Sequence, residues 1–350
     1  MLDSFSTNAT VAKARAIYGK RLTREDYKEL LHRSSVTEVA EYLKRNTHYK
    51  NVLSAIDTNN IHRGFLENLL KRDNFDLYVR LCKFQQLDKI PFYNYIVVKQ
   101  EIEEIVSCVL HLNAKASDEY IETLPSFLIS HASFDLLALA KCRDFSEMLK
   151  VLKKTPYYAI LKDMTPDENG TYDCTMIEAK LYTNYLKWFK DVTDKSFSGK
   201  TASDLDYLTK TQVDLMNLIS GFRLKAFSNA DAATIEQYML PFYGRISRNN
   251  EHEIFEATDP DDYIKRLQKT YYGRQMQMFD ESLDKSMLEN YTHALRAKYA
   301  KIALRASSSA PVSLYTIVFL FDIEVENLIN ILEGIRYKAP LQFIEKLLII

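Results

Sequence analysis

The sequence has 350 residues, a formal net charge of −1 and only 8 glycines and 8 prolines. Each of these two residue types makes up about 2 % of the chain, against about 7 % and 5 % in average proteins. Because helix interiors avoid both residues, this composition predicts an all-α fold of long helices and argues against turn-rich β folds. A net charge near zero provides no overall basic field to attract nucleic acid, so no nucleic-acid partner is expected.

Helical periodicity begins near the amino terminus and continues along the chain. Short helices are expected around residues 30–31 and 39–43, and Thr23 with Asp26 resembles a capping box in front of the first. Longer amphipathic runs alternate with such short segments, and their spacing predicts long helices in antiparallel pairs. These runs cover residues 65–86, 93–112, 177–192, 203–227, 280–305 and 313–336.

An internal repeat runs through the sequence. The apolar spacing of Val39-Ala40-x-x-Leu43 returns at residues 148–152 and 263–267, and each run leads to a threonine and a tyrosine. These endings are Thr47-His48-Tyr49, Thr155-Pro156-Tyr157 and Thr270-Tyr271-Tyr272. They recur about every 110 residues, which is longer than a tetratricopeptide, ankyrin or HEAT repeat. The repeating unit is therefore expected to be the size of a small domain.

Two further matches support the repeat. Residues 18–24 resemble residues 243–248 with one residue deleted after the glycine, and the middle copy lacks this segment. Residues 214–223 match residues 324–336 with three residues inserted, and residues 101–106 form a degenerate first copy. In this alignment Gly19 and Gly244 begin equivalent segments, whereas Gly221 and Gly334 end equivalent helices.

The repeat predicts three similar helical lobes, at residues 1–116, 117–229 and 230–350. Each lobe would consist of short helices and a long antiparallel helix pair. Three such lobes around an axis would form a pseudo-threefold object with a central opening. A closed helical globule produced by duplication is the alternative, because the number of repeats does not determine closure.

Several of these segments resemble the C subunit of the A/V-type rotary ATPases of archaea and bacteria, which is equivalent to the d subunit of the eukaryotic vacuolar enzyme. The matching residues are Ala14-Arg15-Ala16-x-x-Gly19-x-Arg21-Leu22, the run from Leu43 to Tyr49, and Glu326-Asn327-Leu328-x-x-Ile331-x-x-Gly334-x-Arg336-Tyr337. Each motif alone is weak. Their order and spacing along nearly the whole chain make the resemblance specific.

The resemblance implies a funnel-shaped, non-catalytic part of a rotary motor. It would lie on the cytoplasmic face of the membrane, held there through protein contacts. Its implied partners are the D/F-type central-stalk subunits and the c/K proteolipid ring, so that it would link ATP turnover to H⁺ or Na⁺ movement. The alternative is a free-standing helical scaffold that binds a peptide or a helix between its lobes.

Four arginines are the candidate interface residues, because two lobes place them equivalently after a glycine turn. They are Arg21, Arg24, Arg245 and Arg248. They would face rotor-ring loops or acidic groups of the stalk, or they would instead cap helices and form ion pairs between lobes. Lys13 and Arg15, on the first helix, are further candidates.

Motifs for catalysis, cofactors and metals are incomplete. His252-Glu253-x-x-Glu256 lacks the second histidine of a zinc-protease helix, and Asp259-Pro260-Asp261-Asp262 fits a helix start with Asp259 or the preceding threonine as N-cap. The glycine that a P-loop would need five residues before Gly199 is Asp194. We therefore expect no catalytic residue, cofactor, metal or small-molecule substrate.

The remaining features have ordinary explanations. The four cysteines form no C-x-x-C pair and are expected to be reduced, buried thiols. The 23 tyrosines mostly lie at helical spacing, which predicts packing residues with hydrated hydroxyls. The most apolar stretch, residues 314–321, is too short to span a membrane, and residues 1–10 do not read as a secretory signal.

Overall fold

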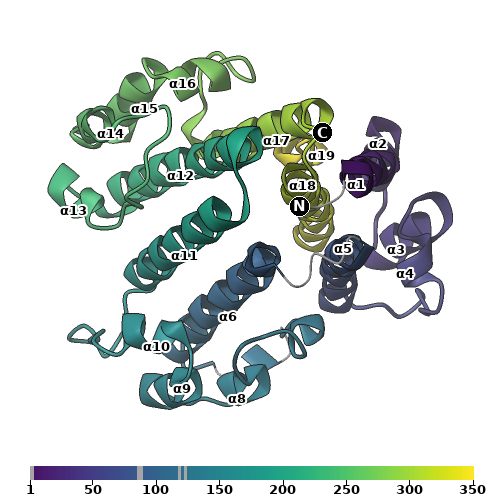
Figure 1. Ribbon diagram of the computed structural model, residues 1–350, viewed down its shortest axis with the longest axis horizontal. Coiled ribbons are helices and arrows are strands. Elements are labelled where there is room, and N and C mark those ends of the chain that lie inside the picture. Colours follow the sequence, from purple (N-terminus) through teal and green to yellow (C-terminus); the bar gives the residue numbers. More distant parts are fainter. Residues whose placement is uncertain (1–3, 85–89, 117–119, 122–123) are drawn as a thin grey trace. The chain divides into compact units, whose positions relative to one another are not determined.

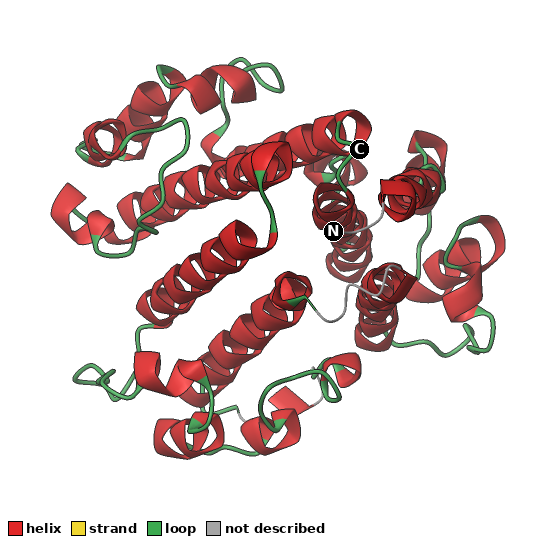
Figure 2. Cartoon of the chain, in the orientation of Figure 1, coloured by secondary structure: helices red, strands yellow, loops and turns green. Residues whose placement is uncertain are grey.

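The computed structural model describes residues 4–84, 90–116, 120–121 and 124–350. Within these ranges every regular element is an α-helix or a short 3₁₀-helix, and no strand is present (Figure 2). The predicted all-α class is therefore confirmed. No helix in the same ranges has an apolar stretch that is long enough to cross a membrane.

The helices are labelled in chain order in Figure 1. The α-helices are α1 (Ser4–Tyr18), α2 (Arg24–Leu31), α3 (Val36–Asn46), α4 (Lys50–Leu53), α5 (Arg63–Phe84), α6 (Tyr95–Asn113), α8 (Leu136–Ala140), α9 (Phe145–Leu152), α10 (Pro156–Leu161), α11 (Cys174–Ser196), α12 (Gly199–Ser228), α13 (Ala232–Glu236), α14 (Arg248–Phe255), α15 (Pro260–Gln268), α16 (Tyr271–Met276), α17 (Leu288–Ala306), α18 (Ala310–Tyr337) and α19 (Leu341–Leu347). The 3₁₀-helices are η2 (Pro91–Asn94), η3 (Ser126–Leu128) and η4 (Lys285–Met287).

The six predicted amphipathic runs correspond to α5, α6, α11, α12, α17 and α18. Five agree closely with the observed helices, although Gln86, the predicted end of the first, lies outside the described residues. The predicted start of α17 at Asp280 is wrong, because the helix begins at Leu288. The Asp280 and Asp284 carboxylates instead accept hydrogen bonds from nearby backbone N–H groups, which stabilises turns and η4.

The chain forms two compact units. Unit 1 contains residues 1–87, 199–229 and 243–350, and unit 2 contains residues 88–198 and 230–242. In unit 1, α18 packs against α1, α5 and α17, and α12 packs against α17. In unit 2, α6 packs against α11. Each unit therefore buries the apolar faces of its own long helices.

The predicted pair formed by α17 and α18 is present, and a short connection joins the two helices. The other predicted pairs, α5 with α6 and α11 with α12, each take one helix from each unit. These two pairs and the lobe boundaries after residues 116 and 229 stay predictions.

Many of the helices begin at a polar N-cap residue, whose side chain accepts a hydrogen bond from the first helical turn. Thr23 and Asp26 form the predicted capping box of α2, and Asp259 accepts hydrogen bonds from the backbone N–H groups of Asp261 and Asp262 at the start of α15. Pro260 occupies the first turn of α15, where the helix needs no N–H from it. Both sequence predictions are therefore confirmed.

The charge on Asp259 should stabilise α15 in a pH-dependent way. Hydrogen bonds from the backbone of Asp262 and Asp261 hold its pKa below the ordinary value of 3.8. Because the pKa is lowered in the folded state, the stabilisation is present above pH 3.8 and is lost as the pH falls below it. Asp259→Asn keeps the capping oxygen, so its melting temperature should lie about 1 °C below wild type at pH 7. The difference should shrink progressively as the pH falls below 3.8, and a difference that widens in acid would contradict this role.

Two glycines do not end helices as the alignment suggested. Gly221 lies inside α12, and Gly334 lies inside α18 three residues before its end. A methyl group on Gly221 would lie 2.5 Å from Cε1 of Phe255, and one on Gly334 would overlap Ile344. These glycines allow neighbouring helices to approach closely. The prediction that they mark helix ends is therefore wrong.

The cysteines agree largely with expectation. All four are free thiols, and Cys82, Cys108 and Cys142 are buried. Cys174 is only half-buried, at the first position of α11. Burial raises the pKa of Cys108 to about 12 and that of Cys142 to about 11, which keeps both thiols protonated at neutral pH.

Candidate functional site

Arg21 and Arg24 lie on the turn between α1 and α2. Gly19 follows α1, and both arginines are exposed on either side of the buried Leu22. The Arg21 guanidinium lies 4.5 Å from the Tyr18 ring centre and donates to the Tyr18 carbonyl. Arg24 is the first residue of α2. The turn therefore presents two cations from a fixed backbone.

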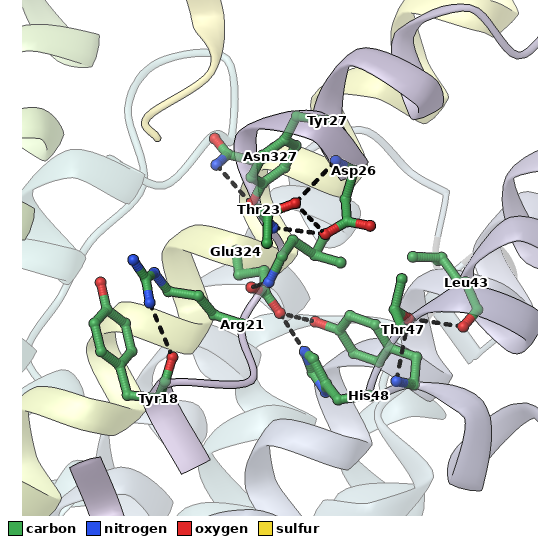
Figure 3. Close-up of polar contacts among 12 residues, drawn as sticks. Tyr18, Arg21, Thr23, Asp26, Tyr27, Leu43, Thr47, His48, Glu324 and Asn327 are labelled. Carbon is green, nitrogen blue, oxygen red and sulfur yellow. Dashed lines mark hydrogen bonds and ion pairs between the residues drawn. The ribbon is translucent and has the colours of Figure 1, made fainter. Parts of the chain in front are cut away.

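A buried carboxylate on α18 holds this turn in place (Figure 3). Glu324 Oε2 accepts a hydrogen bond from the Leu22 backbone N–H at 2.7 Å. Its other oxygen, Oε1, accepts one from the Tyr49 hydroxyl at 3.0 Å and lies 2.6 Å from His48 Nε2. The Glu324 side chain is 5 % exposed, so these partners replace the water it loses.

An equivalent arrangement fixes the turn before α14. Asp214, on α12, accepts hydrogen bonds from the backbone N–H groups of Gly244 at 2.8 Å and Arg245 at 2.7 Å. It also accepts one from the Tyr272 hydroxyl at 2.8 Å. Burial raises the pKa of Asp214, and these hydrogen bonds partly offset the increase. A methyl group on Gly244 would lie 2.6 Å from Asp214 Oδ2, so the close approach requires glycine.

A third buried carboxylate lies in unit 2. Glu101, on α6, is 2 % exposed and accepts hydrogen bonds from the Tyr157 hydroxyl at 2.5 Å and from the backbone N–H of Ser133. Burial, together with the negative charge of Glu101, raises the pKa of Tyr157 well above its ordinary value. The tyrosine therefore stays a neutral donor at physiological pH.

The three arrangements share one plan, which we call the carboxylate module. A long helix supplies the carboxylate, a turn supplies a backbone N–H, and the tyrosine of the repeated Thr-x-Tyr ending supplies a hydroxyl. The modules join α18 to α2–α4, α6 to α8–α10 and α12 to α14–α16. The threonine hydroxyl of each ending donates to a leucine carbonyl three or four residues earlier. The repeat seen in the sequence is thus a repeat of contacts.

Only two of the modules carry the arginine pair. In the module of unit 2, Ser133 supplies the backbone N–H and Leu136 is the first residue of α8. These residues stand where Arg21 and Arg24 stand in the first module and Arg245 and Arg248 in the third. Both arginine turns belong to unit 1.

The other predicted interface residues have specific neighbours. Arg245 lies 4.4 Å from the Tyr271 ring centre, and a hydrogen bond with Tyr207 raises its pKa. Arg248 is exposed at the first position of α14. These contacts orient Arg245 and leave its guanidinium exposed.

The two candidates on α1 stabilise the fold. Arg15 donates hydrogen bonds to the carbonyls of Leu304, Arg305 and Ser307, which satisfies the carboxyl-terminal end of α17. The Lys13 ammonium lies 3.9 Å from the centre of the Phe84 ring. The structure therefore gives each residue a partner within its own unit, and their role in an interface stays a prediction.

Glu101, Asp214 and Glu324 align with one another in the repeated sequence, but the alignment alone does not reveal that they are buried carboxylates. The sequence signal for these buried carboxylates is an acidic residue that recurs at the same position of an otherwise apolar helix. The expectation of hydrated tyrosine hydroxyls is wrong for Tyr49, which is 2 % exposed, and for its equivalents Tyr157 and Tyr272. Their hydroxyls donate to the buried carboxylates instead.

The motifs that suggested chemistry lie on exposed helix surfaces. His252 Nε2, on α14, lies 3.4 Å from Oε1 of Glu256, which caps the end of that helix, and both side chains are exposed. Across the described ranges, no group of three or more histidine, cysteine, aspartate or glutamate side chains is placed to hold a metal ion. The Ser198–Thr201 segment leads into α12, and Lys200 pairs with Asp204 one turn later.

Comparisons with known proteins agree with the sequence resemblance. The profile of the ATP synthase (C/AC39) subunit family matches residues 10–347. The C subunit of the A-type ATP synthase from Methanosphaera stadtmanae is 23 % identical over 288 residues, covering 78 % of this chain and 71 % of the relative. The same subunit from Methanothermobacter thermautotrophicus is 24 % identical over 284 residues, covering 81 % and 70 %. The chain belongs to the ATP synthase (C/AC39) subunit family and is a non-catalytic subunit of a rotary ATPase.

Proposed function

We propose that this chain is the socket that joins the central stalk of the rotary ATPase to its membrane proteolipid ring. In this role it passes torque between ATP turnover and H⁺ or Na⁺ transport. It sits at the cytoplasmic face of the membrane and is held there by protein contacts. The observation that carries the proposal is the match of the C/AC39 family along residues 10–347.

The internal structure of each unit suits a part that must resist twisting. Long helices pack along one another in both units, and close-packed interiors are poorly compressible. The carboxylate modules add a polar joint between each long helix and the short helices beside it. Because the carboxylate of each module is buried, breaking its hydrogen bonds would leave several buried polar groups without partners at once.

The same repeat supports a threefold socket. We propose that the three lobes, residues 1–116, 117–229 and 230–350, surround an axis that receives the foot of the stalk. Each carboxylate module takes its carboxylate from one of these lobes and its turn and tyrosine from another, and this regular pattern supports a common origin for the lobes. The arginine pairs make two of them chemically distinct from the one that carries Ser133 and Leu136.

The two arginine turns are proposed to bind acidic groups of the stalk or of the ring loops. Each exposed charge pair contributes up to about 1 kcal/mol, or about fivefold in affinity. Arg24→Glu combined with Arg248→Glu should therefore reduce retention of the chain on its complex, by up to about 25-fold for two such pairs, in a salt-wash assay. Lys28→Glu with Lys50→Glu, at exposed positions of α2 and α4, is the matched control. Equal retention of both double variants would contradict an arginine interface.

Affinity purification tests the proposal as a whole. A tagged chain extracted with mild detergent should carry D/F-type stalk subunits and the proteolipid with it. Recovery with soluble proteins unrelated to ion transport would instead support the free-standing scaffold. Recovery of the chain alone, from membranes that retain an intact ATPase, would contradict the socket.

A further inference from the structure

A groove runs along one face of α17 in unit 1. It encloses about 780 Å³, and its floor includes Met287, Ala294, Ile302 and Arg305. These residues recur at helical spacing, so the groove follows the helix for about 27 Å at 1.5 Å per residue. Residues 348–350 form part of one wall. A groove of this length matches an extended partner better than a compact ligand.

Positive charge is concentrated at the end of the groove that follows the carboxyl-terminal turns of α17. Lys301 and Arg305 line it, and Arg21 and Arg24 lie close enough to repel the Lys301 ammonium. Burial lowers the pKa of Lys301, and the three arginines lower it further. None of these four cations forms an ion pair with a carboxylate of the described residues. Among the residues that the structure describes, no carboxylate therefore pairs with this cluster.

The opposite end of the groove differs in its electrostatics. Asp280 and Asp284 line it, but their oxygens already accept hydrogen bonds within the chain. Asp280 accepts from the Tyr291 hydroxyl at 2.6 Å and from Ser282, and Asp284 accepts from Ser286. At one end of the groove the cations have no carboxylate partner among the described residues. At the other end the carboxylates already accept hydrogen bonds within the chain. An occupant with negative charge at one end only would complement the groove.

Apolar side chains lie exposed between the two ends. Ile302 is 54 % exposed, and Phe279 and Ile350 are nearly half exposed. An exposed apolar strip beside unpaired charge is typical of a surface that binds an amphipathic helix. A small inorganic anion would neutralise Lys301 and Arg305 but leave this strip in water.

We propose that an amphipathic helix of another subunit docks in the α17 groove, with its acidic residues against Lys301, Arg305, Arg21 and Arg24. The inference rests on the proposed function, because the helix is assigned to the same ATPase. It also extends the candidate interface, since the first arginine turn becomes the cationic end of a longer groove. The equivalent turn at Arg245 lies instead against Tyr207 and Tyr271.

Photo-cross-linking in the assembled ATPase tests this contact. The full chain carries p-benzoylphenylalanine at position 302, or at Leu137 as a control that is also an exposed aliphatic residue. Position 302 should cross-link to an acidic helical segment of another subunit, and position 137 should not cross-link to that segment. If the chain copurifies with the ATPase but position 302 cross-links only within the chain, only to lipid or not at all, this inference would be overturned and the proposed function would stand. Failure to copurify with the ATPase would overturn the proposed function and this inference with it.

Charge reversal tests the acidic character of the occupant. Lys301→Glu with Arg305→Glu should reduce the cross-link yield at position 302 by at least fivefold. Lys265→Glu with Lys269→Glu changes the charge equally at exposed positions on or next to α15 and should leave the yield unchanged. Unchanged melting temperatures of both variants would confirm that they fold. An unchanged yield in the Lys301/Arg305 variant would contradict an acidic helix.

Discussion

Glu324→Ala should lower the free energy of unfolding by about 4 kcal/mol, because it orphans several buried groups at once. The Leu22 N–H and the Tyr49 hydroxyl both lose their acceptor, and His48 loses its partner. Each buried unsatisfied donor costs about 1–3 kcal/mol. The bond to Leu22 also connects residues 302 positions apart in the chain. Chemical denaturation followed by circular dichroism measures the effect.

Two variants make the Glu324 result specific. Glu324→Gln keeps one acceptor oxygen and should lose about half as much stability, since its NH₂ group cannot accept the hydrogen bond from whichever of Leu22 and Tyr49 it faces. Glu326→Ala, on the same helix, removes an exposed carboxylate that lies 3.2 Å from His293. It should cost less than about 1 kcal/mol. A Glu324→Ala protein as stable as Glu326→Ala would contradict the role of the buried carboxylate.

Asp214→Ala should cost about 3 kcal/mol and should also free the turn that carries Arg245. Its carboxylate accepts from the Gly244 and Arg245 N–H groups and from the Tyr272 hydroxyl. The turn is less buried than Tyr272, so water can replace part of what the two amides lose. Hydrogen exchange should therefore accelerate by at least about tenfold at residues 244–246, equivalent to 1.4 kcal/mol of local opening.

Asp206→Ala provides the control for this experiment. Asp206 also lies on α12, but its carboxylate pairs with Lys210 at a partly exposed position. Its removal should change stability by less than about 1 kcal/mol and leave exchange at residues 244–246 unchanged. Equal exchange rates in the Asp214 and Asp206 variants would show that the carboxylate does not position the arginine turn.

The sequence predicted the repeating features because they are local. Apolar spacing predicted the bounds of five of the six long helices within a few residues, and the start of α17 is the exception. Thr23 and Asp259 marked helix starts because capping needs only neighbouring backbone groups. The aligned Thr-x-Tyr endings located Tyr49, Tyr157 and Tyr272. What these tyrosines contact could not be predicted, because helical periodicity identifies a buried face without identifying the group that faces it.

The features that the sequence missed depend on tertiary packing. The first module takes its carboxylate from α18 near the other end of the chain, whereas the second and third take theirs from the long helix α6 or α12 that precedes their short helices. No local sequence pattern indicates which long helix supplies the carboxylate of each module. The prediction that Gly221 and Gly334 end helices is wrong because their role also depends on tertiary packing. The neighbouring side chains of Phe255 and Ile344 leave no room for a side chain at these positions.

Arg15 illustrates how a surface cation can have an internal role. Its position on α1 suggested an interface, but its guanidinium donates to three carbonyls at the end of α17. The Arg21 and Arg24 side chains, in contrast, lie beside other cations at the end of the α17 groove. The fold therefore uses Arg15 for stability, whereas an interface role of Arg21 and Arg24 stays a prediction.

A cross-link between this chain and the central stalk tests the socket most directly. A cysteine at position 24 would be joined through a bifunctional reagent to a protein of the stalk in the purified, membrane-reconstituted complex. Two parts of one rotor turn together, so ATP-driven ion transport should continue at nearly the uncross-linked rate. Loss of transport on cross-linking, restored when a cleavable linker is cut, would show that the two parts move relative to each other and would contradict the account.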